Sequence, residues 1–323
     1  MKYAYVQKLA LNAKNKEQLA AINAIVEKYR KQGYRLSLRQ LYYQLVTQNV
    51  IKNDQKEYAK LSQLLTKGRM AGIVDWDAIE DRLRRPYIPY YVSGLKAAMQ
   101  DTIDQYRLDR MKGQENYLEI WVEKDALSEV LKRSTGPFHV RVMVNRGYSS
   151  TSAMHDAFLR FNSVIDAANE EEESRNVKVT IIYLGDLDPS GEDMTRDIGE
   201  RIKTFFFGFA REDWGWDEEE FDPWFEEHFE IVKIALTVAQ VRQYNPPPNP
   251  AKVSDPRATA YIAKFGHNSW EVDALEPSVL HKLVQDNIKA RIDADMFNAQ
   301  VELEEKHKAF LKKAVEKVTE ADE

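Results

Sequence analysis

The hydrophobic residues of the first 92 positions recur at the spacing of a helix. Between residues 16 and 31 one apolar stripe follows the i, i+3, i+4 rule, and it consists of Leu19, Ile22, Ile25, Val26 and Tyr29. Gly33 ends this segment, and Ser37 can cap a second helix with the sequence LRQLYYQLV. Further helices are predicted near 56–67 and 77–84. Several short helices joined by tight turns are typical of a helix-turn-helix or winged-helix unit.

A different pattern starts after PYIPYYVSG, residues 86–94, where two prolines and a Ser-Gly pair predict a domain boundary. A long amphipathic helix is expected at 95–112. Helical segments then alternate with four apolar runs that are expected to be buried strands: NYLEIWVE, VRVMVN, VKVTIIYLG and EIVKIALT. This alternation predicts a parallel sheet. We therefore expect an α/β protein with a helical, winged-helix-like domain over 1–92. A sheet domain over 93–323 should follow and end in a charged helix near 291–318.

Two segments interrupt the alternation. The acidic and aromatic run REDWGWDEEEFDPWFEEHF is expected to be an insertion or a covering surface. The Pro-rich run QYNPPPNPAKVSDPR is expected to be an extended loop that lies along a surface. Lys252 and Arg257 in this loop could contact phosphate, although a solvated loop is the more ordinary interpretation.

The distribution of charge changes this picture. The net charge is −6, but residues 1–113 contain 21 basic and 11 acidic side chains, whereas the remainder contains 25 and 41. A basic first third indicates a module that binds a polyanion, unless the clustering of solvated charge is accidental. The absence of cysteine excludes disulfides and thiolate metal sites. No signal peptide is evident, and the most apolar stretch, IVKIALTVAQV, is too short to span a bilayer. We expect a soluble, intracellular protein without a membrane partner.

Carboxylates follow two of the predicted strands. Glu123 closes NYLEIWVE, and Asp186 and Asp188 follow VTIIYLG. Ligands of open α/β sheets bind beyond the carboxyl ends of the strands, and hard oxygen donors without nearby His or Cys suit Mg²⁺. Capping of the next helix would explain one of the two aspartates, but not both and not Glu123. Glu119 is a weaker candidate that could orient a ligand from the same strand face.

The acids of the following helix, Glu192 and Asp193, lie in its first turn, where the helix dipole favours negative charge, and we interpret them as structural.

Three motifs in order, EKDAL, RGYSS and GDLDPSG, resemble the Toprim domain of topoisomerases, primases and related nucleases. The resemblance covers roughly residues 115–205 and is greatest to the A subunit of topoisomerase VI and the meiotic double-strand-break transesterases. It implies a Rossmann-like Toprim fold, Mg²⁺ held by Glu123, Asp186 and Asp188, and a phosphodiester in double-stranded DNA as the substrate.

The tyrosine pair in SLRQLYYQLV has two different helical positions. Tyr42 lies on the apolar stripe with Leu41 and Leu45, whereas Tyr43 points away from it, on the face of Arg39. A guanidinium near Tyr43 would favour the phenolate and could hold a phosphate. By itself, an exposed tyrosine beside an arginine is usually an ordinary surface residue. The resemblance extends to an LRxxYY motif, however, and implies that Tyr43 attacks DNA to form a 5′-phosphotyrosyl link, with Arg39 beside it.

The same resemblance implies a homodimer in which the tyrosine of one protomer meets the metal of the other. It implies a type IIB-like DNA topoisomerase or transesterase, cytoplasmic and associated with the nucleoid. An ATPase B-type subunit is a possible separate partner, because the chain has no G-x-x-x-x-G-K-[ST] motif. Only about 35 residues precede the tyrosine motif, however, so the N-terminal extension by which members of the family bind that subunit is short or absent, and the chain resembles a compact, stand-alone A-type subunit. Two alternatives stay open: a Toprim nuclease in which metal-activated water attacks, and a non-catalytic DNA-binding subunit.

Overall fold

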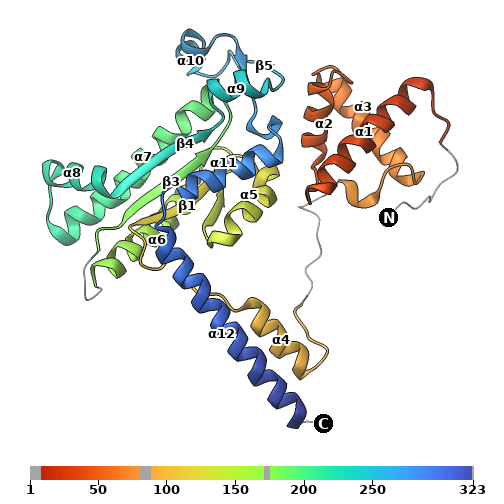
Figure 1. The fold of residues 1–323 in the computed structure, drawn as a ribbon. Coiled ribbons are helices and arrows are strands. Elements are labelled where there is room, and N and C mark those ends of the chain that lie inside the picture. Colours follow the sequence, from red (N-terminus) through yellow and green to blue (C-terminus); the bar gives the residue numbers. More distant parts are fainter. Residues whose placement is uncertain (1–8, 80–88, 171–174, 322–323) are drawn as a thin grey trace.

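The computed structural model describes residues 9–79, 89–170 and 175–321. A helical domain built from the first of these ranges lies beside a larger α/β domain (Figure 1). The helical domain consists of α1 (Ala13–Lys31), α2 (Leu38–Thr47) and α3 (Gln55–Met70). Its buried residues form one hydrophobic cluster that includes the predicted stripe of α1.

Side-chain caps fix where these helices begin. The Asn12 side chain accepts a hydrogen bond from the backbone N–H of Asn15 at the start of α1. Ser37 caps α2 as predicted, and Gln40 completes a capping box by bonding back to the Ser37 N–H. The helix predicted at 77–84 was only partly right. A short 3₁₀ turn (Trp76–Ala78) occurs there, and residues 80–88 lie outside the described part of the chain.

No strand pair that would form a wing is present among residues 9–79, where Leu36 and Ile79 form an isolated parallel bridge. The domain boundary near residue 92 stays a prediction, because it adjoins residues outside the described ranges.

Four parallel strands form the sheet, which confirms the α/β class. They are β1 (Asn116–Val122), β2 (Arg141–Val144), β3 (Lys178–Leu184) and β4 (Phe229–Ala235), in the spatial order β2-β1-β3-β4. The register pairs Val122 with Leu184, so β1 and β3 end side by side. This order brings the residues after β1 next to the residues after β3.

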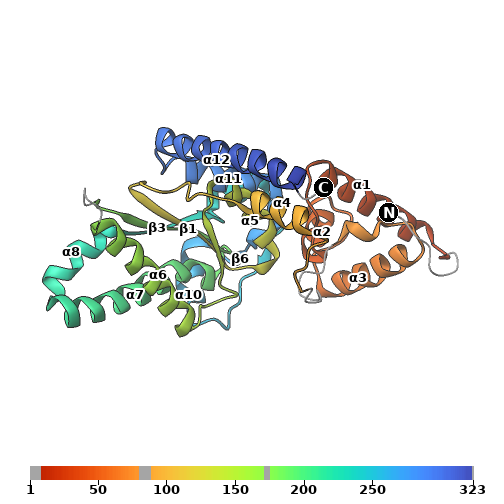
Figure 2. The same cartoon turned by 90° about the horizontal axis from the view of Figure 1, so that it is seen from below.

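Side chains of alternate residues point to opposite faces of the sheet, and each face has its own core. Ile120 and Ile182 belong to the cluster on the face covered by α5 (Ser128–Thr135) and α11 (Pro277–Lys289). Trp121 and Tyr183 belong to the cluster on the opposite face, which is covered by α6 (Thr151–Asn169), α7 (Pro189–Phe209) and α8 (Glu218–His228). Figure 2 shows the strands between these two helical layers. Cover on both faces explains why the strands read as continuous apolar runs.

The interrupting segments are more ordered than predicted. The acidic and aromatic run forms a π-helical turn (Ala210–Trp214) and α8, which buries Phe221 completely. After α9 (Val238–Tyr244), the Pro-rich segment forms β5 (Asn249–Pro250), which pairs antiparallel with β6 (Asn268–Ser269) across α10 (Ala258–Phe265).

The helix predicted at 95–112 is shorter, because α4 (Leu95–Gln105) ends at Gln105 and the chain then runs irregularly to β1. It packs on α12 (Ala294–Ala321), the predicted charged helix, and the two form an arm that leaves the body of the protein (Figure 1). Glu304 of α12 is fully buried and is paired with Arg110 and Lys308. Within the described residues, no helix combines the length and the apolar composition needed to cross a membrane.

Candidate active site

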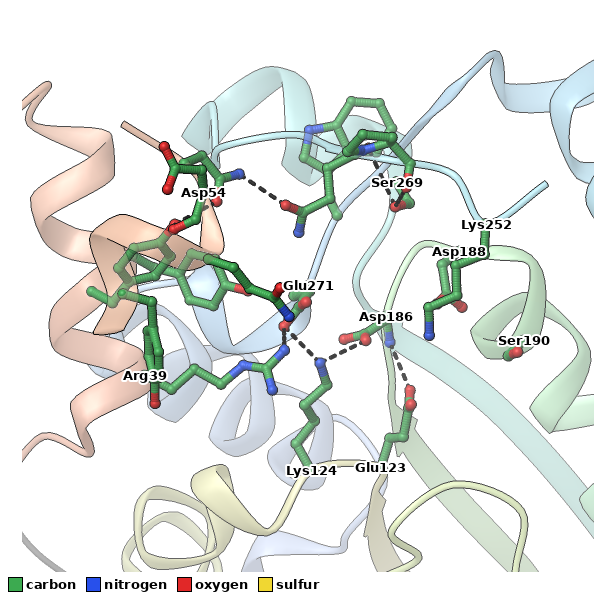
Figure 3. A pocket seen from close by; sticks show the side chains of 18 residues that line it. Arg39, Asp54, Glu123, Lys124, Asp186, Asp188, Ser190, Lys252, Ser269 and Glu271 are labelled. Atoms are coloured by element: carbon green, nitrogen blue, oxygen red, sulfur yellow. Dashed lines mark hydrogen bonds and ion pairs between the residues drawn. The ribbon is translucent and has the colours of Figure 1, made fainter. Parts of the chain in front are cut away.

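A cavity of about 680 Å³ lies between α2 and α3 of the helical domain and the carboxyl ends of the sheet strands (Figure 3). The five residues singled out in the sequence, Arg39, Tyr43, Glu123, Asp186 and Asp188, all line it. They come from three separate parts of the chain, and a single protomer brings them together. The resemblance implied instead that the tyrosine and the acids meet between two protomers.

Glu123 and Asp186 meet because β1 and β3 are neighbours. The backbone N–H of Asp186 donates to Glu123 Oε2 at 3.2 Å, and the Glu123 N–H donates to the Leu184 carbonyl at 3.0 Å. A β-carbon at Gly191 would collide with the Asp186 carbonyl, so the glycine of GDLDPSG lets the first turn of α7 lie against this strand end. The motif is thus a tight strand-to-helix connection that holds its carboxylates near Glu123.

The two aspartates have different roles in the local structure. Asp188 is the N-cap of α7, and its Oδ1 accepts the Gly191 N–H at 2.6 Å. Asp186 is not a cap. Its Oδ1 accepts the Val272 N–H at 2.9 Å, and its Oδ2 pairs with the Lys124 ammonium at 2.7 Å. Capping therefore accounts for Asp188 alone, and the burial of Asp186 needs the positive charge of Lys124.

Glu123 forms no ion pair within the described ranges, although the charge of Lys124 acts on it. Burial, followed by the negative charge of Asp186, raises the pKa of Glu123 to about 7, although the hydrogen bond from the Asp186 N–H opposes this rise. Asp188 adds further negative potential. The strand ends therefore carry more negative charge than the neighbouring side chains neutralise.

An ion-pair network that the sequence reasoning missed crosses from the helical domain to the sheet domain. Arg39 of α2 pairs with Glu271 through Nη2 and with Asp273 through Nε, the latter at 3.3 Å. Lys124 reaches the same Glu271 oxygen, Oε2, at 2.8 Å. Figure 3 shows the Lys124 ammonium between Asp186 and Glu271, and the Arg39 guanidinium next to Lys124, also in contact with Glu271. The two domains are therefore joined by charge at the cavity wall.

The two acids of this network differ in environment. Burial opposes the ionised form of Glu271, but Lys124 and Arg39 outweigh it and lower the pKa of Glu271 to about 2. Asp273 is completely enclosed, and burial raises its pKa to about 7 despite the same two cations. Neither carboxyl oxygen of Asp273 has a hydrogen-bond partner, so its contacts with Arg39 and Lys124 are ionic.

A clue to these acids lay in the segment HNSWEVDAL, where carboxylates alternate as they do in GDLDPSG. The backbone of Trp270 bonds to that of Leu187, so the two acidic segments run side by side.

The tyrosine pair corrects one expectation. Tyr43 lies beside Arg39 as predicted, with the guanidinium 5.9 Å from the ring centroid, but it is not exposed. Tyr42 and Tyr43 are both 5% exposed. On the side of Tyr43, α2 packs against residues 272–274 of the sheet domain. Burial and then Glu271 raise the pKa of Tyr43, and the opposing effect of Arg39 is smaller. Arg39 therefore favours the phenolate as predicted, but in this conformation burial and Glu271 outweigh its effect.

Tyr42 is held from another direction. Its hydroxyl donates to Asn53 Oδ1 at 2.9 Å and approaches the Asp54 carbonyl at 3.2 Å. Its ring packs edge-on against Tyr58. These contacts tie Tyr42 to the connection between α2 and α3, whereas Tyr43 contacts the ionic network.

Two other residues considered in the sequence, Glu119 and Arg257, do not line the cavity. Glu119 is buried away from the cavity, where it accepts hydrogen bonds from Tyr117, Trp121 and Arg160, so it organises the face below α6. Arg257 is engaged by Asp193 and Asp255 and does not line the cavity.

Glu192, in the first turn of α7, accepts a hydrogen bond from Lys233, in keeping with a structural role. Lys252 lines the cavity from the β5–α10 loop and is largely exposed.

The chemistry of the cavity fits a divalent cation. Five carboxylates and three basic side chains line it, and the raised pKa of Glu123 marks a position where negative charge lacks compensation. All the acidic donors there are hard oxygens, which suit Mg²⁺. With the side chains as they stand, no three acidic or imidazole groups in the described ranges are grouped to hold a metal. Asp186 is engaged by Lys124, so metal binding requires that this contact loosen.

Comparison with known proteins returned no match: no family model fits the chain, and no curated protein and no solved structure is significantly similar to it. The resemblance to Toprim proteins therefore rests on the motifs, and what it implies stays a prediction.

Proposed function

We propose that the chain is a Mg²⁺-dependent DNA transesterase of the topoisomerase VI A type, with a winged-helix-like domain that carries Tyr43 and a Toprim-like domain that carries Glu123, Asp186 and Asp188. One observation carries the proposal: the tyrosine and the three carboxylates line the same cavity. A phosphodiester is an anion, and a cavity with more acids than bases repels it unless a cation enters with it. A nucleophile, an acidic cation site and a basic N-terminal third are the parts that such a reaction needs.

In the proposed reaction the Tyr43 oxygen forms a bond to phosphorus, and the bond between phosphorus and the 3′ oxygen of the DNA breaks. The tyrosyl proton leaves Tyr43, and the departing 3′ oxygen is protonated, so that a 5′-phosphotyrosyl link and a free 3′ hydroxyl result. Arg39, next to the Tyr43 ring, holds a non-bridging phosphate oxygen. When bound by Glu123, Asp186 and Asp188, Mg²⁺ supplies charge stabilisation for the phosphoryl oxygens. A double-strand cut needs two tyrosines, so we propose a homodimer as the working unit.

A second candidate is supported by the environment of Tyr43. Because Tyr43 is buried and its pKa is raised, its hydroxyl is a weak nucleophile in the conformation observed. A metal-activated water needs no tyrosine, and the same three carboxylates serve a nuclease. The two reactions leave different products, a protein-linked DNA end in one and a free phosphate end in the other.

The test is to incubate the protein with Mg²⁺ and supercoiled DNA, stop the reaction with detergent, and look for DNA covalently joined to protein. We expect an adduct with the native protein and none with Tyr43→Phe. Tyr42→Phe is the matched control, because it removes a hydroxyl from the same cavity wall and should keep the adduct. Metal-dependent cutting that persists in Tyr43→Phe would establish the nuclease. Native protein that cuts nothing, with any divalent cation, would leave only DNA binding.

A further inference from the structure

Glu271 is the anion on which two cations of the cavity wall meet. Its Oε2 atom meets the Lys124 ammonium at 2.8 Å and the Arg39 guanidinium, and its carboxylate is also a hydrogen-bonding partner of the Tyr43 hydroxyl. Two cations thus converge on a single oxygen of a carboxylate that also interacts with the Tyr43 hydroxyl. Figure 3 shows this convergence at the cavity wall, beside Asp186.

A phosphodiester group resembles a carboxylate in the features that Arg39, Lys124 and Tyr43 can bind. Each is a monoanion with two equivalent outer oxygens, and both pair with arginine through charge-assisted hydrogen bonds. The same donors therefore cannot serve Glu271 and a phosphate at the same time. The competition is strongest at Arg39 and Lys124, because Arg39 already makes two ion pairs and Lys124 makes three.

Glu271 and Asp273 differ in how readily each side chain can move away from Arg39 and Lys124. The Asp273 side chain is fully enclosed and meets both cations, so it holds them in place whether or not Glu271 is present. The Glu271 side chain retains 21% of its exposure and faces the cavity. Withdrawal of Glu271 leaves Arg39 and Lys124 positioned by Asp273 but without their exchangeable partner.

We propose that Arg39, Lys124 and the Tyr43 hydroxyl form a phosphate-binding subsite, and that Glu271 is an internal anion that a DNA phosphate displaces when it binds. The inference deepens the proposed function, on which it rests only for the identity of DNA as the ligand. It adds Lys124 to the residues that contact substrate. It also makes Glu271 a determinant of affinity, since each bound phosphate must first compete with a tethered carboxylate.

The subsite explains how Tyr43 could exchange its partner. In the structure its hydroxyl interacts with Glu271, whereas after displacement of Glu271 it would face phosphorus. The loss of the Glu271 charge would also remove one of the two acidic influences that raise the pKa of Tyr43, while Arg39 would remain.

The test compares Glu271→Gln with the native protein in binding a short fluorescent DNA duplex, measured by anisotropy in EDTA over a range of salt concentrations. Glutamine keeps the size of the side chain but removes the charge that competes with phosphate. We expect affinity at low salt to rise about tenfold, and the slope of log affinity against log salt to steepen by about 1 to 2, because Arg39 and Lys124 can each contact a phosphate. Inorganic phosphate should compete for the duplex more effectively in the variant.

Glu276→Gln is the matched control. Glu276 also joins the sheet domain to the helical domain, through Lys28 at 2.6 Å, but it does not line the cavity. A general loosening of the domains or a simple change of net charge would affect both variants alike. Equal affinity of Glu271→Gln and Glu276→Gln would overturn the subsite.

A second variant and separate measurements of binding and adduct formation distinguish the subsite from effects on folding and catalysis. If Glu271→Gln fails to fold, Glu271→Asp withdraws the carboxylate by one methylene and should give a smaller gain; an affinity equal to that of the native protein would refute the proposal. Binding is measured without Mg²⁺, and adduct formation by the native protein is tested separately with Mg²⁺. A tighter Glu271→Gln complex in EDTA, together with no adduct in Mg²⁺, would support the subsite and reject the transesterase. An adduct with unchanged affinities would do the reverse.

Discussion

Glu123 offers a direct measure of how strongly the cavity repels its own carboxylates. The pKa of Glu123 is raised from its ordinary value of 4.5 to about 7, by burial first and by Asp186 second. The folded chain therefore binds this proton more tightly than the unfolded chain. The contribution of Glu123 to stability is complete below pH 4.5 and is lost as the pH rises toward 7. Glu123→Gln replaces the carboxylate by a neutral group of nearly the same shape.

The magnitude follows from the two pKa values. A rise from 4.5 to about 7 corresponds to roughly 3 kcal/mol between the protonated and ionised forms. Glu123 keeps part of its exposure to solvent, which screens the repulsion, so we expect about 1–3 kcal/mol. At pH 5 the two proteins should be about equally stable, and at pH 8 the variant should be more stable by this amount. Asp273, whose pKa is also raised to about 7, is present in both proteins and cancels from the comparison.

The assay is urea unfolding of both proteins at pH 5 and pH 8 in EDTA, followed by repetition at pH 8 with Mg²⁺. If Glu123 is a metal ligand, Mg²⁺ should stabilise the native protein and affect the variant much less. Stability curves that run parallel at the two pH values would refute the electrostatic reasoning. A Mg²⁺ effect of equal size in both proteins would refute the assignment of Glu123 to the metal.

Two further predictions concern the arm and the basic domain. Arg110→Leu removes a partner of the buried Glu304 carboxylate. Because Lys308 stays in place, we expect a loss of about 1–3 kcal/mol in the free energy of unfolding. Lys282→Ala breaks an exposed pair on α11 and should cost under about 0.5 kcal/mol, so similar losses in the two variants would show that Glu304 is not held by charge. Duplex DNA should bind with little sequence preference and an affinity that falls steeply between low and physiological salt, which filter binding or anisotropy would measure; an affinity independent of salt would exclude phosphate contacts as its source.

The order and type of the main elements were determined locally, by periodicity and capping chemistry. The apolar stripe of α1, the Ser37 cap of α2 and the four strands all follow from residues close together in the chain, although only β1 and β3 are largely buried. The grouping of Glu123 with Asp186 could also be anticipated, because parallel strands place their carboxyl ends at one edge of a sheet. Only the strand order made the two direct neighbours, however, since β1 and β3 pair with each other while β2 lies on the other side of β1.

The environment of Tyr43 was beyond the reach of any local pattern. Its position opposite the apolar stripe of α2 predicted exposure, but a helical stripe records only what the helix packs against within its own domain. The cover comes from residues 272–274, and the Glu271 carboxylate that meets Arg39 is 232 positions away in the chain. An ion pair across that separation leaves no periodic trace, because either residue alone looks like an ordinary solvated charge. The sequence therefore supplied the reactive groups and the strand ends that carry them, while the docking of the two domains decided their burial, their charge partners and the cavity between them.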